Sequence, residues 1–155
     1  MDLDLLLNIE KPSRYLGGEV NQVRKDPRGI RCRVGLCYPD VYEIGTSHLG
    51  LQVLYQTVNG RDDMAAERVF CPWPDMEQAL REHGKPLTTL ESGVPLAELD
   101  VLGFTLQYEL SCTNVLTVLD LGGIPLLAEE RRPEDPIVIA GGPCAYNPEP
   151  LSSFL

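Results

Sequence analysis

Four short apolar runs divide the sequence into alternating segments. The runs are rich in β-branched and aliphatic residues, as buried strands are, and they cover residues 30–38, 66–71, 99–106 and 137–140. Between them, apolar residues recur three and four positions apart, which predicts helices over residues 49–58, 76–83 and 111–121. Strands that alternate with helices predict an α/β fold with a parallel sheet covered on both faces.

The first helix carries clear boundary signals. Pro39 ends the preceding strand, because proline has no N–H to give to the ladder. Thr46 or Ser47 is placed to cap the helix, and Asn59 with Gly60 closes it. The apolar positions at helical spacing are Leu49, Val53, Leu54 and Val58.

The second helix and the ends of the chain give weaker signals. Asp75 can cap the second helix, with Gln78 completing a capping-box-like pair. Residues 1–10 can form a short helix, whereas residues 11–29, punctuated by Gly and Pro, predict an irregular arm packed against another part of the molecule. Residues 148–150, Pro-Glu-Pro, are expected to start a further helix.

Composition and charge limit the classes of function that this protein can have. The 155 residues suit one domain, and 43% hydrophobic with 23% charged residues is typical of soluble globular proteins. A formal net charge of −10 without any Lys/Arg-rich run argues against a nucleic-acid-binding surface. The five cysteines show neither zinc-ribbon spacing nor a Cys-x-x-Cys pair. The acidic N-terminus does not resemble a signal peptide, and no apolar run has membrane length, so we expect a cytoplasmic protein without a membrane partner.

Three polar loops follow strands of the predicted sheet. In open parallel sheets, ligands bind outside the carboxyl ends of the strands where the winding reverses, and a strand order 2-1-3-4 places that crevice between the first and third strands. Loops 40–47, 107–111 and 141–147 are expected to meet there, although each could also be a plain turn or a solvated loop. No Gly-x-Gly-x-x-Gly, Walker-type or nucleophile–base–acid arrangement is present. An autonomous dehydrogenase, kinase or hydrolase is therefore not expected.

Four motifs from the arm and the loops, taken in order, form a specific pattern. They are Arg14-Tyr15-Leu16-Gly17-Gly18-Glu19, Tyr38-Pro39-Asp40-Val41-Tyr42-Glu43-Ile44-Gly45, Gly103-Phe104-Thr105-Leu106-Gln107-Tyr108-Glu109 and Ala140-Gly141-Gly142-Pro143. Together they resemble the amino-terminal region of radical S-adenosylmethionine (radical SAM) proteins. The particular subfamily is the one whose iron–sulfur domain follows a cobalamin-binding-like domain. The resemblance extends from about residue 11 to residue 155.

The resemblance implies a flavodoxin-like (Rossmann-like), doubly wound sheet of order 2-1-3-4-5, cut before its last strand. It implies an N-terminal arm over residues 1–29, then a cobalamin-binding-like α/β domain over residues 30–155. A downstream barrel would carry a 4Fe-4S cluster and S-adenosylmethionine. The Cys-x-x-x-Cys-x-x-Cys triad that holds such a cluster does not occur in this sequence. Radical chemistry is therefore expected outside this chain, and a sheet edge without its fifth strand is expected to be exposed.

The resemblance raises the question of whether this chain binds cobalamin. One large class of cobalamin domains uses Asp-x-His-x-x-Gly after the first strand, whose histidine binds cobalt. Tyr42 stands at that position here, and a phenol is a poor cobalt ligand beside imidazole. Two alternatives remain: cobalamin held without a protein ligand on cobalt, or a fold that has lost the cofactor. The cofactor-binding residues implied are Asp40, Tyr42, Glu43, Gly45, Thr105, Gln107, Gly141 and Gly142, with no catalytic and no metal-ligating residue among them.

Two functional hypotheses follow. In the first, the chain is an accessory, cobalamin-binding-like domain that binds cofactor or positions substrate for its own downstream radical SAM domain, with a small molecule as ligand. In the second, it has lost cobalamin and is a structural or interaction domain that only docks on the catalytic domain. A free-standing flavodoxin-like electron carrier ranks last, because the acidic loop 38–43 would repel a phosphate. The chain alone is not expected to be catalytic.

Overall fold

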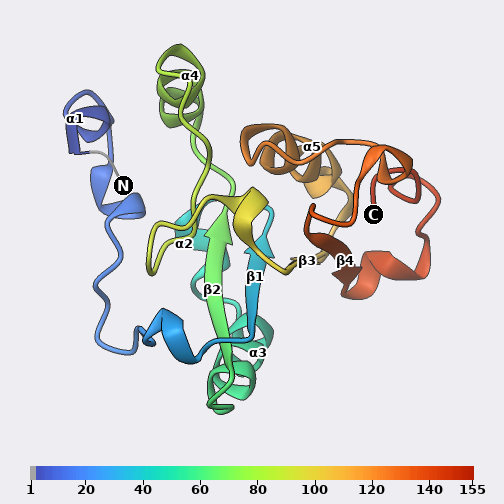
Figure 1. Cartoon of the computed structure of the whole chain (residues 1–155). Coiled ribbons are helices and arrows are strands. Elements are labelled where there is room, and N and C mark those ends of the chain that lie inside the picture. Colours follow the sequence, from blue (N-terminus) through green and yellow to red (C-terminus); the bar gives the residue numbers. More distant parts are fainter. Residues whose placement is uncertain (1–2) are drawn as a thin grey trace.

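A single parallel sheet forms the centre of the molecule (Figure 1). The computed structural model describes residues 3–155. Four strands pair in the order β2-β1-β3-β4, which confirms the predicted order 2-1-3-4 and the flavodoxin-like class. In register, Cys37 of the first strand pairs with Phe104, and Phe104 pairs with Ala140. The strand bounds are β1 Cys32–Tyr38, β2 Met64–Phe70, β3 Val101–Thr105 and β4 Ile137–Gly141.

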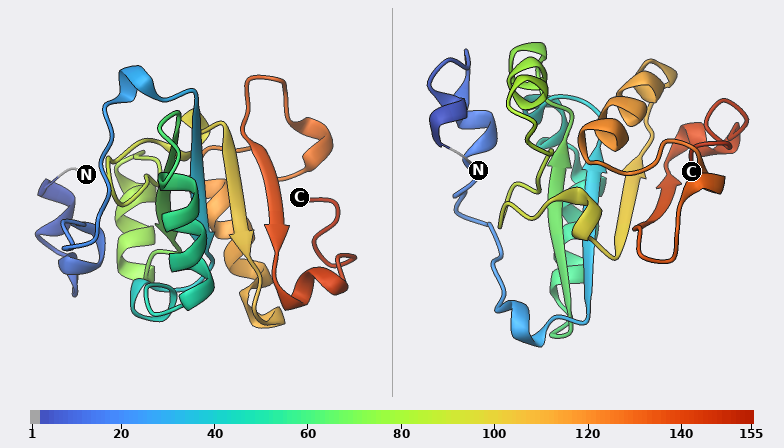
Figure 2. Two further views of the ribbon diagram at one scale, coloured as in Figure 1. Left: turned by 90° about the horizontal axis from the view of Figure 1, so that it is seen from below. Right: turned by 45° about the horizontal axis from the view of Figure 1, so that its top comes forward.

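Three longer helices lie on the two faces of the sheet (Figure 2). On one face, α3 (Leu49–Asn59) buries Leu51 and Tyr55 against β1 and β2. On the other, α4 (Pro74–Glu82) and α5 (Cys112–Leu121) pack into the larger apolar core. Both faces are therefore covered at β1 and β2, as the alternating pattern predicted.

Shorter elements connect these layers. Two are single helical turns, α1 (Leu3–Leu6) and α2 (Tyr42–Gly45). The others are 3₁₀ turns: η1 Pro12–Tyr15, η2 Pro27–Gly29, η3 Leu96–Glu98, η4 Glu109–Ser111, η5 Ala128–Glu130 and η6 Pro143–Tyr146. Residues 148–154 form hydrogen-bonded turns without a helix, so the expected helix after residue 148 was wrong. Bonds there span three residues, as from Leu151 N–H to the Pro148 carbonyl (2.9 Å).

The α3 face of the sheet is only half covered. Val138 points into the core beneath α5, so its neighbours Ile137 and Ile139 point to the opposite face, because side chains alternate along a strand. These two isoleucines are 65% and 52% exposed. Strand β4 therefore presents apolar side chains to solvent on the α3 side.

Two predictions about helix boundaries were wrong. His48, not Thr46 or Ser47, caps α3, and its Nδ1 accepts the Leu51 N–H (3.1 Å). Helix α4 has no side-chain cap, and Asp75 instead accepts the Glu10 N–H (2.8 Å). The cap of α3 is thus shifted by one or two residues, whereas the expected cap of α4 is used by a residue far away in the sequence. The apolar spacing of α3 was also misleading. Three of the four apolar residues whose spacing predicted this helix, Leu49, Val53 and Leu54, are exposed.

The two edges of the sheet differ sharply. At β2, the backbone N–H of Leu90 donates to the Arg68 carbonyl (2.9 Å), and the Glu91 carboxylate accepts the Arg68 N–H (2.6 Å). Residues from the loop before β3 thus occupy the hydrogen-bonding groups of this edge. At β4, the sheet ends without a further strand.

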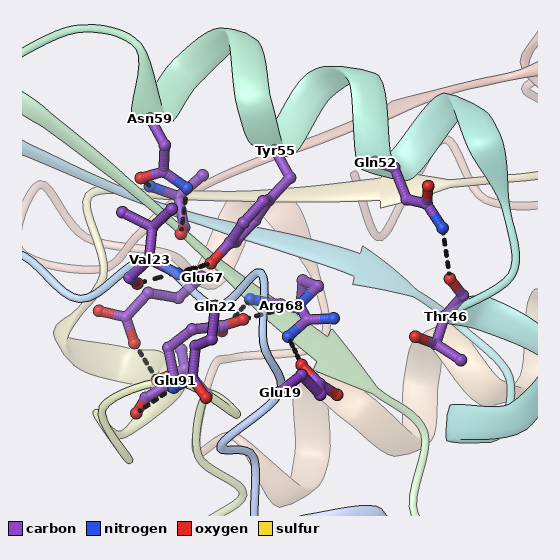
Figure 3. A network of polar contacts seen from close by, with 12 residues as sticks. Glu19, Gln22, Val23, Thr46, Gln52, Tyr55, Asn59, Glu67, Arg68 and Glu91 are labelled. Atoms are coloured by element: carbon purple, nitrogen blue, oxygen red, sulfur yellow. Dashed lines mark hydrogen bonds and ion pairs between the residues drawn. The ribbon is translucent and has the colours of Figure 1, made fainter.

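The N-terminal arm reinforces the closed edge, which confirms that it packs against another part of the molecule (Figure 3). Arg68 projects from β2 between Glu19 of the arm and the buried Glu91, and pairs with both. Burial outweighs this ion pair and raises the pKa of Glu91. The Tyr55 hydroxyl of α3 accepts the Val23 N–H of the arm (2.7 Å). At this edge the arm is thus held by α3 and β2.

The substitution Arg68→Met is expected to lower the free energy of unfolding by about 3 kcal/mol, because it leaves the Glu91 carboxylate buried without its cation. Urea unfolding followed by circular dichroism measures this. The matched control is Arg28→Met, which breaks the exposed pair with Asp26 and should leave the unfolding midpoint unchanged. Equal midpoints for both variants would contradict a stabilising role for the buried pair.

Candidate functional site

The three predicted loops do gather at one rim of the sheet. All four strands are parallel, so their carboxyl ends lie at the same end of the sheet. The Asn114 side chain donates to the Pro39 carbonyl (3.0 Å), linking the loop after β1 to α5. The Cys144 N–H donates to the Leu106 carbonyl (3.2 Å), linking the loops after β4 and β3. The rim expected from the sequence therefore exists.

Asp40 and Tyr108 close the crevice between β1 and β3. The Tyr108 hydroxyl donates to the Asp40 carboxylate, across the gap between the two loops. This hydrogen bond, with burial as a smaller cause, raises the pKa of Tyr108 to about 12. The pair spans the place where the sequence predicted a ligand.

Tyr42 and Glu43 are turned toward the N-terminal arm. The Tyr42 hydroxyl donates to the Glu19 carboxylate. The Arg14 Nε donates to both carboxylate oxygens of Glu43 (2.9 and 3.0 Å), and the Lys11 Nζ lies 3.7 Å from Glu43 Oε1. These two predicted site residues therefore hold the arm.

The three predicted glycines have different surroundings. A Cβ on Gly45 would lie 2.5 Å from the Phe70 ring, so protein atoms fill that space. Gly142 has φ +107°, and a Cβ there would lie 2.5 Å from the Leu106 carbonyl oxygen. At Gly141 a Cβ would meet no atom within 4 Å. Only Gly141 leaves room for a ligand.

The open space lies on the outer side of β4. A groove of about 850 Å³ runs between β4, η6 and the last residues of the chain, and we call it the β4 groove. Its volume falls in the range of ligand sites. Gln107 lines it, and Thr105 and Gly141 adjoin it as a pair in register. Lining residues outside the predicted set include Val138, Ala140, Pro143, Tyr146 and Leu151.

The predicted set thus divides into two groups. Thr105, Gln107 and Gly141 lie at the β4 groove, whereas the other five predicted residues stabilise the loops or the arm. Sequence reasoning missed the groove because it placed the site between β1 and β3. One signal pointed toward it: the predicted loop 141–147 supplies five consecutive lining residues, 143–147.

The crevice between β1 and β3 does not fit the tail of a corrinoid. The Asp40–Tyr108 hydrogen bond crosses it. The small residues that would admit a tail, Gly45 and Gly142, are already packed against Phe70 and Leu106. Cobalt would find no histidine there, because His48 points its Nδ1 at the backbone of α3.

The cysteines divide between the core and the surface. Burial raises the pKa of Cys37, and it raises the pKa of Cys71 to about 12, so both thiols are inert. Cys112 and Cys144 line the β4 groove. Within residues 3–155, no group of three or more His, Cys, Asp or Glu side chains could hold a metal ion. Nor is any helix in that range both long and apolar enough to cross a membrane.

The substitution Asp40→Asn is expected to lower the pKa of Tyr108 from about 12 toward about 10, the ordinary value. Tyrosinate absorbance during a pH titration measures this. The raised pKa also means that the hydrogen bond stabilises the fold fully below about pH 10, and that this stabilisation is lost as the pH rises toward about 12. The melting temperatures of wild type and Asp40→Asn should therefore differ at neutral pH and converge at alkaline pH. A difference that persists at alkaline pH would contradict the assignment.

Comparison with known proteins identifies the family. A family model described as the N-terminal region of radical SAM proteins matches residues 50–155, which is more than half of the chain. No curated protein and no solved structure matches the chain significantly. The match includes the carboxyl half of the domain, with β3, β4 and all the residues of the β4 groove. The chain therefore belongs to the family of N-terminal domains of radical SAM proteins.

Proposed function

We propose that this chain is an accessory domain that positions the substrate of a radical SAM protein for its iron–sulfur domain, and that the β4 groove holds this substrate. The observation that carries the proposal is the open volume of about 850 Å³ at the carboxyl ends of β3 and β4. Open parallel sheets bind ligands at this end. The polar side chains of Gln107 and Asn147 lie in its wall and can orient a ligand.

Substrate is favoured over cobalamin as the ligand. The crevice that the resemblance assigns to cobalamin is closed by side chains, as described above. The β4 groove has one carboxylate, Glu109, and no lysine or arginine in its lining. The phosphodiester of a corrinoid tail would therefore meet a negative charge without a compensating cation.

A second candidate function, docking on the catalytic domain, is supported by the uncovered half of the sheet. Ile137 and Ile139 are exposed on the α3 side of β4. Exposed apolar side chains that lie together mark interaction surfaces. Ile139 also lines the β4 groove, whereas Ile137 does not, so a substitution at Ile137 can separate the two functions.

Hydroxocobalamin is expected not to stay with the protein. After incubation and gel filtration, the corrinoid absorbance should elute with the small molecules, because neither the crevice nor the groove accepts the tail. Gly141→Trp serves as the matched variant, since position 141 is the open glycine. Retention of corrinoid by the wild type, with loss on Gly141→Trp, would overturn the choice of substrate over cobalamin.

In a full-length radical SAM protein that contains this domain, Ala140→Trp is expected to lower substrate-dependent turnover at least about tenfold, a barrier change of ~1.4 kcal/mol, because the indole fills the β4 groove. Reductive cleavage of S-adenosylmethionine without substrate should stay within about twofold, because it takes place in the iron–sulfur domain. The matched variant is Ile137→Lys on the α3 side. Loss of turnover with Ile137→Lys, and none with Ala140→Trp, would favour the docking function instead.

A further inference from the structure

Another cavity lies at the β2 edge of the sheet, away from β4. Its volume is about 480 Å³, within the range of small-ligand sites, and we call it the β2 pocket. Its walls come from the arm between residues 23 and 27, from residues 65–67 of β2 and from the loop between residues 91 and 98, together with Arg33 of β1. All of its lining residues precede β3, so neither β4 nor the last residues of the chain take part in it.

Two buried glutamates in the lining are already paired (Figure 3). Glu67 accepts hydrogen bonds from Arg33 Nη1 (2.9 Å) and from Thr89 Oγ1 (2.5 Å). Glu91 accepts the backbone N–H and the Nε–H of Arg68, both at 2.6 Å. These carboxylates therefore give the pocket a fixed wall and do not need a ligand as a partner.

The backbone of β2 beside the pocket is also in use. The Asn59 Oδ1 accepts the Ala66 N–H (3.0 Å), and the Asn59 Nδ2 donates to the Ala66 carbonyl (3.1 Å). The Lys25 Nζ donates to the Met64 carbonyl (2.7 Å). This part of the edge is thus closed to an added strand, and a ligand would have to be recognised by side chains.

Two cations of the arm have no carboxylate partner. Arg24 is exposed, and no hydrogen bond or ion pair of its side chain is found within residues 3–155. The Lys25 Nζ contacts only the carbonyl oxygens of Arg61 and Met64 in the described part of the chain, and these do not neutralise its charge. The β2 pocket therefore holds two positive charges that nothing in the described chain compensates.

Arg33 and Glu98 complete the polar lining. Arg33 uses Nη1 for Glu67 and for the Ser92 hydroxyl (3.2 Å), whereas its Nε and Nη2 make no hydrogen bond to any described residue. Glu98 is exposed, and no cation contacts it within residues 3–155, so its carboxylate can accept a hydroxyl group of a ligand. The rest of the lining is small or apolar: Val23, Pro27, Ala65, Ala66 and Val94.

The charge that matches this lining is that of a phosphomonoester. A phosphomonoester carries a charge of about −1.5 to −2 at pH 7, which the two uncompensated cations, Arg24 and Lys25, together balance. Arginine binds phosphate oxygens through its planar fork, and lysine binds them as a point charge. A carboxylate would leave one of the two cations without a partner. A polyphosphate would bring more negative charge than they neutralise into a pocket that also contains Glu98.

We propose that the β2 pocket binds a small organic phosphomonoester. Its phosphoryl group pairs with Arg24 and Lys25 and takes a further hydrogen bond from Arg33, while its carbon body lies against Val23 and Val94. Because the first two cations belong to the arm and Arg33 belongs to β1, the bound ester joins the arm to the sheet. This site is separate from the β4 groove and does not rest on the function proposed above.

The test is isothermal titration calorimetry of the protein in phosphate-free buffer with phenyl phosphate, inorganic phosphate and benzyl alcohol. Phenyl phosphate should bind at least about tenfold more tightly than inorganic phosphate, because its ring buries apolar surface. Benzyl alcohol, which lacks the charge, should show no saturable binding. Added sodium chloride should weaken the binding of phenyl phosphate, because salt screens the charges of exposed groups such as Arg24.

Two variants locate the binding. Arg24→Gln should weaken phenyl phosphate at least about tenfold, and it should leave the urea unfolding midpoint unchanged, because Arg24 has no partner in the described chain. The matched control is Arg28→Gln, which removes the same charge from the same arm at a side chain that is 89% exposed and lies outside the pocket. It should bind as the wild type does. Phenyl phosphate should also slow amide hydrogen exchange over residues 19–29 in the wild type and not in Arg24→Gln.

Each contrary result has a distinct meaning. Unchanged binding by Arg24→Gln, or an equal loss in Arg28→Gln, would overturn the β2 pocket as the site. Equal affinities for phenyl phosphate and inorganic phosphate would overturn the ester in favour of free phosphate. Binding of benzyl alcohol as tight as that of phenyl phosphate would overturn recognition of an anion. Turnover in Ala140→Trp is a separate measurement, so the proposed function and this inference can fail independently.

Discussion

Backbone hydrogen bonding at the sheet edges is the constraint on which the rest of this structure depends. A four-stranded parallel sheet has two outer strands whose N–H and C=O groups require partners. The molecule meets this requirement at β2 with its own chain, through Leu90, Glu91 and the arm. Within residues 3–155, β4 has no neighbouring strand on its outer side. The β2 edge is therefore closed by loop and arm residues that come from far along the chain.

Most of the predicted site residues at the rim stabilise the fold. Side chains that could have served a cofactor instead fix the loops. Asp40 holds Tyr108, Glu43 holds Arg14, and Gly45 accommodates Phe70. These contacts fill the crevice between β1 and β3, and the ligand site that we propose lies one strand further out.

The fold was largely predictable from sequence, because strand and helix periods repeat along the chain and parallel order follows from their alternation. Boundaries set by distant contacts were not predictable. Asp75 does not cap α4, because it is engaged by Glu10, sixty-five positions away. The cap of α3 was missed for a local reason, since histidine, which reaches Leu51 three positions on, is not among the common cap residues. The site was found only in part: Gln107 lines the groove, but the walls of the groove come from β4, η6 and residues 148–155, which meet only in the folded chain. That property belongs to the assembled sheet and not to any local motif.

The distribution of thiols has a practical consequence. Cys37 and Cys71 are sealed in the interior, while Cys112 and Cys144 border the β4 groove. An alkylating reagent would therefore mark the groove, together with the half-buried Cys32 at the start of β1, and spare the core. Mass spectrometry of the native protein could then read, from the label at these two positions, whether the groove is occupied or vacant. Cys112 and Cys144 can thus report whether the groove is occupied, without any engineered probe.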